Sequence, residues 1–207
     1  MKANIDYSLY LCTDRNLMSC STIEECVESA LKGGVTVVQL REKDITSRQF
    51  YNLGCKIREI TRAYSRPLII NDRVDIAIAV GADGVHIGQS DLDCSVVRQI
   101  VGPDMIIGVT AHNVDEAVRA VKAGADYLGV GAIRATSTKS EAKVIARSEL
   151  ISIRKAVDVP MVIIGGIGKD NAPDFKGMGI NGIAVVSAIV SQPNIEEAAR
   201  ELKQIWR

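Results

Sequence analysis

The sequence lacks a net charge, a run of basic residues and any paired cysteine motif. Its 207 residues include 25 lysines and arginines and 25 aspartates and glutamates. Because nucleic-acid-binding proteins gather basic residues on one face, this balance argues against a nucleic-acid partner. The five cysteines are scattered and form no Cys-x-x-Cys pair. We therefore expect reduced thiols in a cytoplasmic protein, with neither a disulfide framework nor a zinc site.

Targeting and membrane-spanning segments are also missing. The first six residues, Met1-Lys2-Ala3-Asn4-Ile5-Asp6, contain no apolar core of a signal peptide. No apolar run approaches the ~20 residues that cross a bilayer. The nucleophile elbow Gly-x-Ser-x-Gly, the Walker loop and the dinucleotide fingerprint are absent too. The sequence thus predicts a soluble protein with no membrane partner, and it leaves the oligomeric state open, a homo-oligomer included.

What the sequence does contain is a regular alternation of short apolar runs and helix-like segments. Each apolar run has the length and composition of a strand, and each is followed by helical periodicity. The strands are expected at Ser8–Cys12, Val35–Arg41, Leu68–Asn71, Gly84–Ile87, Met105–Val109, Tyr127–Gly131, Met161–Ile164 and Gly182–Val186. Capping-box spacing predicts helix starts at Thr22 with Glu25, Thr46 with Gln49, Asn113 with Glu116 and Asn194 with Glu197.

A short glycine-containing segment precedes four of the expected strands, in residues 30–34, 79–83, 121–126 and 176–181. Glycine can end a helix in the left-handed conformation and so lead the chain into the next strand. Strict alternation with short links favours a single α/β domain over residues 1–207. Eight units in this length fit a (β/α)8 TIM barrel, with a doubly wound sheet as the alternative.

The stretch Gln39-Leu40-Arg41-Glu42-Lys43 follows the second expected strand. Side chains alternate along a strand, so Gln39, Arg41 and Lys43 share one face. Two cations at the mouth of a buried strand favour an anionic ligand, because burying unpaired charge is costly; a solvated strand end is the alternative. In a barrel the active site lies at the carboxyl ends of the strands. Other polar residues expected there are Thr13, Asp14, Asn71, Asp72, Gly88, Gln89, Asp91, Thr110, residues 136–139, Gly165, Gly166 and Ser187.

Two of these groups suit particular ligands. The glycines of Ile164-Gly165-Gly166-Ile167-Gly168, with a short helix after Val186-Ser187, are typical of a phosphate site, although they could simply form a tight turn. Asp72 and Asp91 follow neighbouring strands and could bind Mg²⁺. The alternative is that Asp72 caps one helix, and Asp91 or Asp93 the next.

The loop between Gly131 and Ser148 is longer than the others and contains Thr136-Ser137-Thr138-Lys139. Hydroxyls beside a lysine can bind phosphate oxygens, and a long loop in a compact domain can act as a lid; a solvated loop is the alternative. His86 and His112 fit no nucleophile or metal-ligand pattern, so we expect hydrogen-bonded structural histidines. The tyrosines, Tyr10 and Tyr127 among them, are interpreted as packing residues.

Taken in order, these motifs resemble the thiamine phosphate synthase family over nearly the whole chain. The matching segments are residues 39–43, 70–73, 84–91, 108–113, 126–131, 136–139, 164–167 and 182–187. The resemblance implies a Mg²⁺-dependent (β/α)8 transferase. It would join 4-amino-2-methyl-5-hydroxymethylpyrimidine diphosphate to 4-methyl-5-(2-phosphoethyl)thiazole, or its carboxylated form, through a dissociative pyrimidine carbocation.

The resemblance also implies roles for individual residues. The diphosphate would be held by Arg41, Lys43, Asn71 and Lys139, and Mg²⁺ by Asp72 and Asp91. Gln39 would face the pyrimidine, Gly166, Val186 and Ser187 would hold the thiazole phosphate, and Thr136 and Thr138 would lie near the second substrate.

Two positions depart from the family pattern. Thr110 stands where the family usually has serine, near the pyrimidine and diphosphate, which keeps the catalytic hydroxyl and adds a methyl group. Arg134-Ala135 replaces the usual Phe-Pro at the start of the long loop, which bears on whether that loop closes over substrate. Two alternative functions are a thiazole tautomerase-like paralogue and a non-catalytic thiamine phosphate sensor. A sensor would not need a set of metal and diphosphate residues, and a tautomerase would not keep the full set. Both are therefore disfavoured by the combined presence of Arg41, Lys43, Asn71, Asp72, Asp91 and Lys139.

Overall fold

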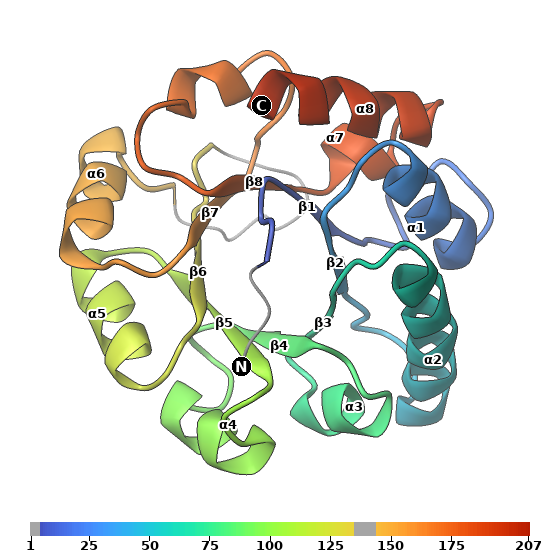
Figure 1. The fold of residues 1–207 in the computed structure, drawn as a ribbon, viewed down its shortest axis with the longest axis horizontal. Helices are drawn as coiled ribbons and strands as arrows, with labels where there is room; N and C mark the ends of the chain where they lie inside the picture. The colour runs from blue at the N-terminus through green and yellow to red at the C-terminus, as the bar shows by residue number, and fades with distance from the viewer. Residues whose placement is uncertain (1–4, 135–143) are drawn as a thin grey trace.

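The computed structural model describes residues 5–134 and 144–207. In this part of the chain eight parallel strands close into a barrel in sequence order, and β8 pairs back onto β1 (Figure 1). The predicted (β/α)8 architecture is confirmed. The strands are β1 (Leu9–Cys12), β2 (Val37–Leu40), β3 (Leu68–Asn71), β4 (Gly84–Ile87), β5 (Ile106–Ala111), β6 (Tyr127–Val130), β7 (Met161–Ile164) and β8 (Gly182–Val185).

Helices surround the barrel and connect consecutive strands (Figure 1). The seventh connection contains only a 3₁₀ turn, and the last strand is followed by a very short helix and then a long one. The helical elements are α1 (Ile23–Lys32), α2 (Ser47–Ala63), α3 (Val74–Ala79), α4 (Cys94–Val101), α5 (Val114–Lys122), α6 (Arg147–Ala156), η1 (Ala172–Phe175), α7 (Ser187–Val190) and α8 (Ile195–Trp206).

The strand boundaries differ from the expected ones by at most two residues. β2 ends at Leu40, so Arg41 lies in the following loop and not in the strand. β5 runs on to Ala111, because Thr110 and Ala111 pair with Gly129 and Val130 of β6. That extension places the Thr110 side chain within the barrel mouth and not beyond it.

All four predicted helix N-caps are confirmed, since each cap side chain accepts a hydrogen bond from the main-chain N–H three residues later. Only Thr46 and Gln49 form the reciprocal capping box, in which the Gln49 side chain also accepts from the Thr46 N–H. The predicted left-handed glycines between helices and strands are confirmed as well. Gly34, Gly81 and Gly124 have φ values of +106°, +62° and +100°, a region that glycine enters without steric cost.

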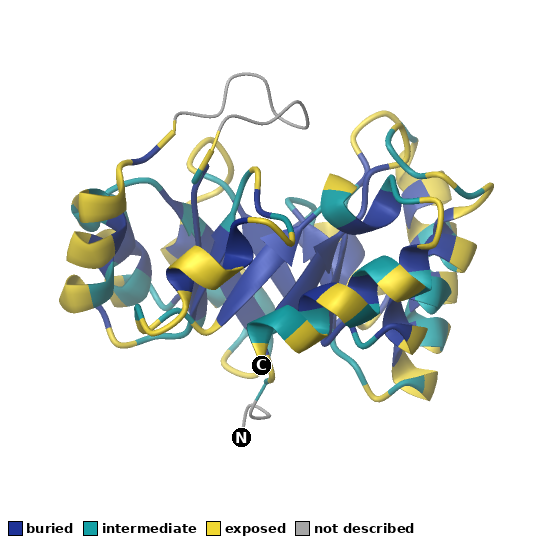
Figure 2. Ribbon diagram, turned by 90° about the horizontal axis from the view of Figure 1, so that it is seen from above, coloured by how far each residue is buried: buried dark blue, intermediate teal, exposed yellow. Residues whose placement is uncertain are grey.

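Side-chain alternation divides the core into two layers. Outward-facing strand residues such as Leu11 and Ile70 pack against the helices. Inward-facing residues such as Tyr10, Ile69 and Tyr127 fill the barrel. Figure 2 shows the buried strands at the centre and the exposed faces of the helices outside. Among the described helices, none combines the length and apolarity that a membrane span requires.

Candidate functional site

One cavity opens where the strands end, and eight residues that the sequence analysis placed at the site line it. They come from five different strand ends, which are far apart along the chain. A closed barrel places those ends around one mouth. The eight are Gln39, Arg41, Asn71, Thr110, Gly165, Gly166, Val186 and Ser187.

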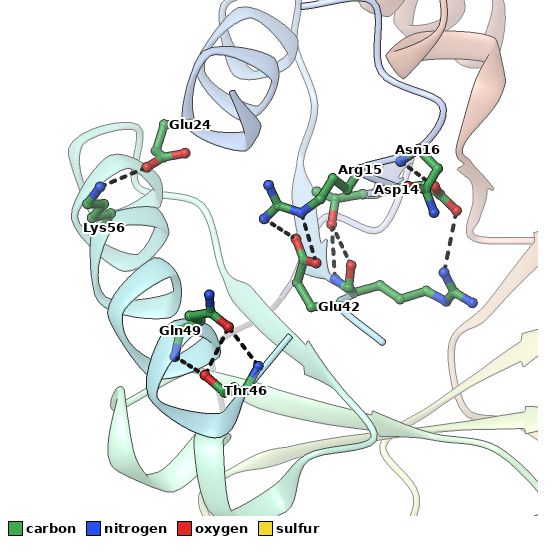
Figure 3. A network of polar contacts seen from close by, with 10 residues as sticks. Asp14, Arg15, Asn16, Glu24, Glu42, Thr46, Gln49 and Lys56 are labelled. Atoms are coloured by element: carbon green, nitrogen blue, oxygen red, sulfur yellow. Dashed lines mark hydrogen bonds and ion pairs between the residues drawn. The ribbon is translucent and has the colours of Figure 1, made fainter. Parts of the chain in front are cut away.

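Arg41 is held at the cavity by groups from the loop after β1. Its Nη1 lies 3.4 Å from Asp14 Oδ2, and its main-chain N–H donates to Thr13 Oγ1 at 3.0 Å. Glu42 leaves in the other direction and binds Arg15 Nη2 at 2.8 Å; Figure 3 shows this pair beside Asp14. Arg41 and Glu42 therefore have different partners, as expected for neighbouring residues whose side chains point in opposite directions. The Asp14 partner was missed, because nothing local in the sequence pairs residues 27 positions apart.

Lys43, Asp72 and Asp91 form a charged group beside the cavity. Lys43 Nζ makes an ion pair with Asp72 Oδ2. Asp72 has a φ of +59°, unusual for a residue with a side chain, and its N–H donates to the His86 carbonyl at 2.8 Å. This conformation turns the chain sharply as β3 ends. The Asp91 carboxylate accepts a hydrogen bond from the Gly88 N–H at 2.7 Å.

Burial raises the pKa of the Asp91 carboxyl above its ordinary value, and the neighbouring Asp72 carboxylate raises it further. The Gly88 N–H and the Lys43 ammonium oppose these effects. Two carboxylates thus lie close enough to repel each other, which is a donor set that a divalent cation such as Mg²⁺ fits. Across residues 5–134 and 144–207 no group of three or more His, Cys, Asp or Glu side chains could hold a metal ion. A cation that bound here would find these two carboxylates as its ligands among the described residues.

The alternative that aspartates cap the next helices is correct only for Asp93, which occupies the N-cap position of α4 without a side-chain cap hydrogen bond. Asp72 and Asp91 are not N-caps, and the N-cap of α3 is Arg73. The Asp72 side chain instead accepts a hydrogen bond from Lys43, and the Asp91 side chain accepts one from the Gly88 N–H. Both carboxylates therefore lie in the loops that follow β3 and β4, before α3 and α4 begin.

The opposite side of the mouth is built from main chain. Gly165 and Gly166 have φ values of +96° and +65°, and a Cβ on Gly165 would lie 2.6 Å from the Ala132 Cβ. Buried Asn171 holds the turn: its Nδ2 donates to the Gly166 carbonyl at 2.8 Å, and its Oδ1 accepts from the Gly168 N–H at 3.0 Å. Sequence reasoning missed Asn171, although an asparagine soon after a glycine-rich turn is a usable signal.

This side carries no charge in the described residues that line the cavity after β7 and β8. The main-chain N–H groups of Gly165, Gly166 and Ser187 take no part in the turn and loop hydrogen bonds of the described residues. Ser187 also begins α7. Such N–H groups suit a phosphate, because they donate hydrogen bonds without carrying a formal charge.

A hydrogen-bonded chain of five side chains crosses the barrel, and all five line the cavity. Gln39 Nε2 donates to Tyr10 Oη at 2.8 Å, and Tyr10 Oη lies 2.8 Å from Tyr127 Oη. Tyr127 Oη lies 2.9 Å from His86 Nδ1, and His86 Nε2 lies 3.0 Å from Thr110 Oγ1. Burial raises the pKa of both tyrosine hydroxyls well above the ordinary value, which keeps them protonated.

The expectation that both histidines are hydrogen-bonded is confirmed, since His112 Nδ1 lies 2.8 Å from Glu116 Oε2. The interpretation of Tyr10 and Tyr127 as packing residues was incomplete. Their rings do pack in the barrel, but their hydroxyls link Gln39 to His86. Thr136, Ser137, Thr138 and Lys139 lie outside the described residues, as does Ala135. Arg134 is described and lies 3.8 Å from exposed Asp174.

The fold and this mouth define a class: a (β/α)8 enzyme with a charged side and a main-chain side around one small-molecule cavity. Comparison with known proteins gives the particular family. The family model described as thiamine monophosphate synthase matches residues 9–189, and the chain belongs to this family.

The chain is similar over its whole length to curated relatives. It is 56% identical over 204 residues to the thiamine-phosphate synthase of Clostridium botulinum, covering 99% of this chain and 96% of the relative. It is 55% identical over 206 residues to that of Ruminiclostridium cellulolyticum, covering 100% of this chain and 98% of the relative. The solved structure of thiamine phosphate pyrophosphorylase from Pyrococcus furiosus superposes with a TM-score of 0.90 at 40% identity, over 97% of this chain and 96% of that one.

Proposed function

We propose that the chain joins 4-amino-2-methyl-5-hydroxymethylpyrimidine diphosphate to 4-methyl-5-(2-phosphoethyl)thiazole, giving thiamine phosphate and diphosphate. As a member of its family, the chain is a transferase of thiamine biosynthesis. The observation that supports these two substrates is that one cavity has two chemically different sides. Arg41 and Asn71 line one side, and Gly166 and Ser187 the other.

The charged side suits the diphosphate. In the proposed reaction the C–O bond between the pyrimidine methyl carbon and the diphosphate breaks, and both electrons leave with the diphosphate. Arg41 and Lys43 would stabilise the charge that develops there, and the Asn71 amide would donate a hydrogen bond. The ion pairs with Asp14 and Asp72 hold the two cations in place before substrate binds. Lys139 would join them from the loop after β6.

Asp72 and Asp91 would hold Mg²⁺, which when bound neutralises leaving-group charge. The raised pKa of Asp91 supports this assignment, because repulsion between the carboxylates is relieved by a cation. Lys43 offsets part of that repulsion through its ion pair with Asp72. The negative charge of Asp72 is thus already partly balanced by Lys43, and a bound cation would neutralise mainly the charge of Asp91.

The main-chain side suits the thiazole phosphate. Its charge does not change in the reaction, so the site has only to hold it and aim the thiazole nitrogen at the pyrimidine methyl carbon. The N–H groups of Gly166 and Ser187 would bind the phosphate oxygens, with Val186 packing beside them. Thr136 and Thr138 would contribute from the loop after β6. The thiazole nitrogen lone pair then forms the new C–N bond.

Two other functions make different predictions. A thiazole tautomerase-like protein needs the Gly166 and Ser187 side but no diphosphate site, so the group of Arg41, Lys43 and Asp91 favours the synthase. A thiamine phosphate sensor would bind the product and have no use for a leaving-group site.

The test is to mix the purified chain with both substrates and Mg²⁺ and to measure thiamine phosphate and diphosphate. We expect equal amounts of the two products, and no product without the pyrimidine diphosphate. Asp91→Ala is expected to abolish most turnover, with Asp93→Ala as the matched control on the same loop. Binding of both substrates without turnover would contradict the synthase and favour the sensor.

A further inference from the structure

The hydrogen-bonded chain from Gln39 to Thr110 has a direction. The Gln39 Nε2 group can only donate, so the single hydroxyl hydrogen of Tyr10 is left to donate to Tyr127. With Tyr10 donating, Tyr127 must donate to His86 Nδ1, and this requires a neutral His86 to carry its ring hydrogen on Nε2, which faces Thr110 Oγ1. Every member donates toward Thr110.

The opposite direction is available only if all the members reverse together. It would require the Gln39 carbonyl to accept from Tyr10, Tyr127 to donate to Tyr10, and His86 to carry its hydrogen on Nδ1. A mixed arrangement leaves two hydrogens or two lone pairs facing each other at one of the links. Because Tyr10 and Tyr127 are 1% and 0% exposed, water cannot repair such a link. The direction is therefore a property of the whole series of hydrogen bonds from Gln39 to Thr110.

Both ends of the chain line the cavity, and the direction decides what they offer to a ligand. In the direction that the Gln39 Nε2 donor sets, Gln39 turns its carbonyl oxygen away from Tyr10, and Thr110 retains a hydroxyl hydrogen that His86 does not use. The cavity then presents an acceptor at Gln39 and a donor at Thr110. Reversal would present a donor at Gln39 and an acceptor at Thr110.

We propose that Tyr10, Tyr127 and His86 are positioning residues that fix this direction and so make the site select an aminopyrimidine over the corresponding oxopyrimidine. An exocyclic amino group donates to the Gln39 carbonyl, and a ring nitrogen lone pair accepts from the Thr110 hydroxyl. The oxo ring has the reverse pattern, a carbonyl oxygen beside a ring N–H. Its carbonyl oxygen would face the Gln39 carbonyl oxygen, and its ring N–H would face the Thr110 hydroxyl hydrogen. This selection rests on the pyrimidine diphosphate being the substrate, as proposed above.

Two strand positions beside the Tyr127 and His86 rings are glycines, Gly108 and Gly129, which have no side chain to occupy that space. A Cβ on Gly108 would overlap the Tyr127 ring, and a Cβ on Gly129 would lie 3.0 Å from His86 Cε1. Both glycines lie within strands, where glycine packs poorly and often marks the close approach of another group. Here that group is the pair of rings that carries the chain from Tyr10 to Thr110.

Tyr127→Phe removes the central hydroxyl and disconnects Gln39 from His86. The matched control is Tyr7→Phe: the Tyr7 ring also packs on Tyr127, with centroids 4.9 Å apart, but its hydroxyl is not part of the chain. The measurement is the ratio of kcat/KM for the 4-amino and 4-oxo pyrimidine diphosphates at saturating thiazole phosphate. We expect Tyr127→Phe to lower this ratio about 10- to 100-fold, since polar matching is what rejects an analogue of the same shape. Tyr7→Phe should leave it unchanged.

Tyr10→Phe breaks the chain at a different link and should lower the ratio in the same way, which provides a second variant if Tyr127→Phe does not fold. A folded Tyr127→Phe or Tyr10→Phe protein with an unchanged ratio would overturn the inference. A wild-type chain that makes no thiamine phosphate would instead overturn the proposed function.

The direction itself can be read in the wild-type protein without turnover. Nitrogen-15 NMR of the ring nitrogens distinguishes the two neutral histidine tautomers. Because the protein contains only 2 histidines, the His112→Gln variant identifies the signals of His86. We expect the hydrogen on Nε2 of His86. A neutral His86 with its hydrogen on Nδ1 would show that the chain runs the other way and would refute the proposed selection.

Discussion

The two sides of the barrel mouth offer an anion different kinds of binding group. The β2–β4 side uses full charges, with Arg41 and Lys43 each held by a carboxylate. The β7–β8 side uses main-chain N–H groups around Gly166 and Ser187, held in shape by Asn171. We propose that the difference follows the chemistry of the proposed reaction: charge would develop on a leaving diphosphate, so fixed opposite charges would lower the barrier, whereas a spectator phosphate would need only to be held.

The largest expected effect is on the charged side. Lys43→Ala should lower kcat about 10²- to 10³-fold, because it removes a cation aimed at developing charge, and should change the KM for thiazole phosphate little. Steady-state kinetics with each substrate varied in turn measures both. Lys56→Ala is the control, since Lys56 pairs with Glu24 between α1 and α2, away from the mouth. Equal losses for both substrates would mean that the mouth is not divided as described.

The converse change is on the main-chain side. Gly166→Ala introduces a side chain at a φ of +65° and should shift the turn. We expect the KM for thiazole phosphate to rise about tenfold, which corresponds to the 1–2 kcal/mol that an L residue costs in this region, with kcat nearly unchanged. Gly168→Ala is the matched control, because a Cβ there would meet nothing within 4 Å. A variant that loses kcat and keeps its KM would contradict the assignment.

A third prediction concerns the carboxylate pair in the absence of metal. The folded-state pKa of Asp91 is raised, so the folded protein holds its proton to higher pH than the unfolded chain does, and stability falls as pH rises through that interval. Asp91→Asn keeps an acceptor for the Gly88 N–H but cannot ionise. It should flatten this fall and raise the metal-free Tm at neutral pH by about 1–3 °C.

Thermal unfolding followed by circular dichroism in EDTA, from acidic to neutral pH, checks this prediction. Asp93→Asn on the same loop is the control. Added Mg²⁺ should raise the Tm of the wild type and not that of Asp91→Asn. Identical pH profiles for the wild type and Asp91→Asn would show that the carboxylates do not repel each other.

The smallest expected effect is at Thr110. Thr110→Ser keeps the hydroxyl that His86 Nε2 contacts at 3.0 Å and removes only a methyl group. Activity should stay within about threefold of wild type, as for substitutions that leave the stabilising contacts in place. Thr110→Val, which keeps the shape and removes the hydroxyl, should lower activity much more. If the serine variant were the more impaired, the methyl group and not the hydroxyl would be the functional part.

The fold could be predicted because its signals are local. Strand runs, N-caps such as Thr46 and left-handed glycines such as Gly34 each depend on a few neighbouring residues, and barrel closure then follows from the strict alternation. Local patterns also placed Arg41 and Gly166 at the mouth, since Arg41 directly follows β2 and Gly166 lies two residues after the end of β7.

The contacts that set the properties of those residues could not be predicted in this way. Asp14 meets Arg41 only because β1 and β2 are neighbours in the closed barrel. Tyr10 contacts Tyr127 although the two are 117 residues apart, and in the sequence neither can be distinguished from an ordinary core residue. A polar tip on an apolar ring carries no pattern that tells a packing tyrosine from a linking one.

The most direct test of the divided mouth is a crossed binding measurement. Isothermal titration calorimetry would give the affinities of diphosphate with Mg²⁺ and of thiazole phosphate for the wild type, Lys43→Ala and Gly166→Ala. We predict that Lys43→Ala weakens only the diphosphate and that Gly166→Ala weakens only the thiazole phosphate. Equal weakening of both ligands by either variant would contradict the account.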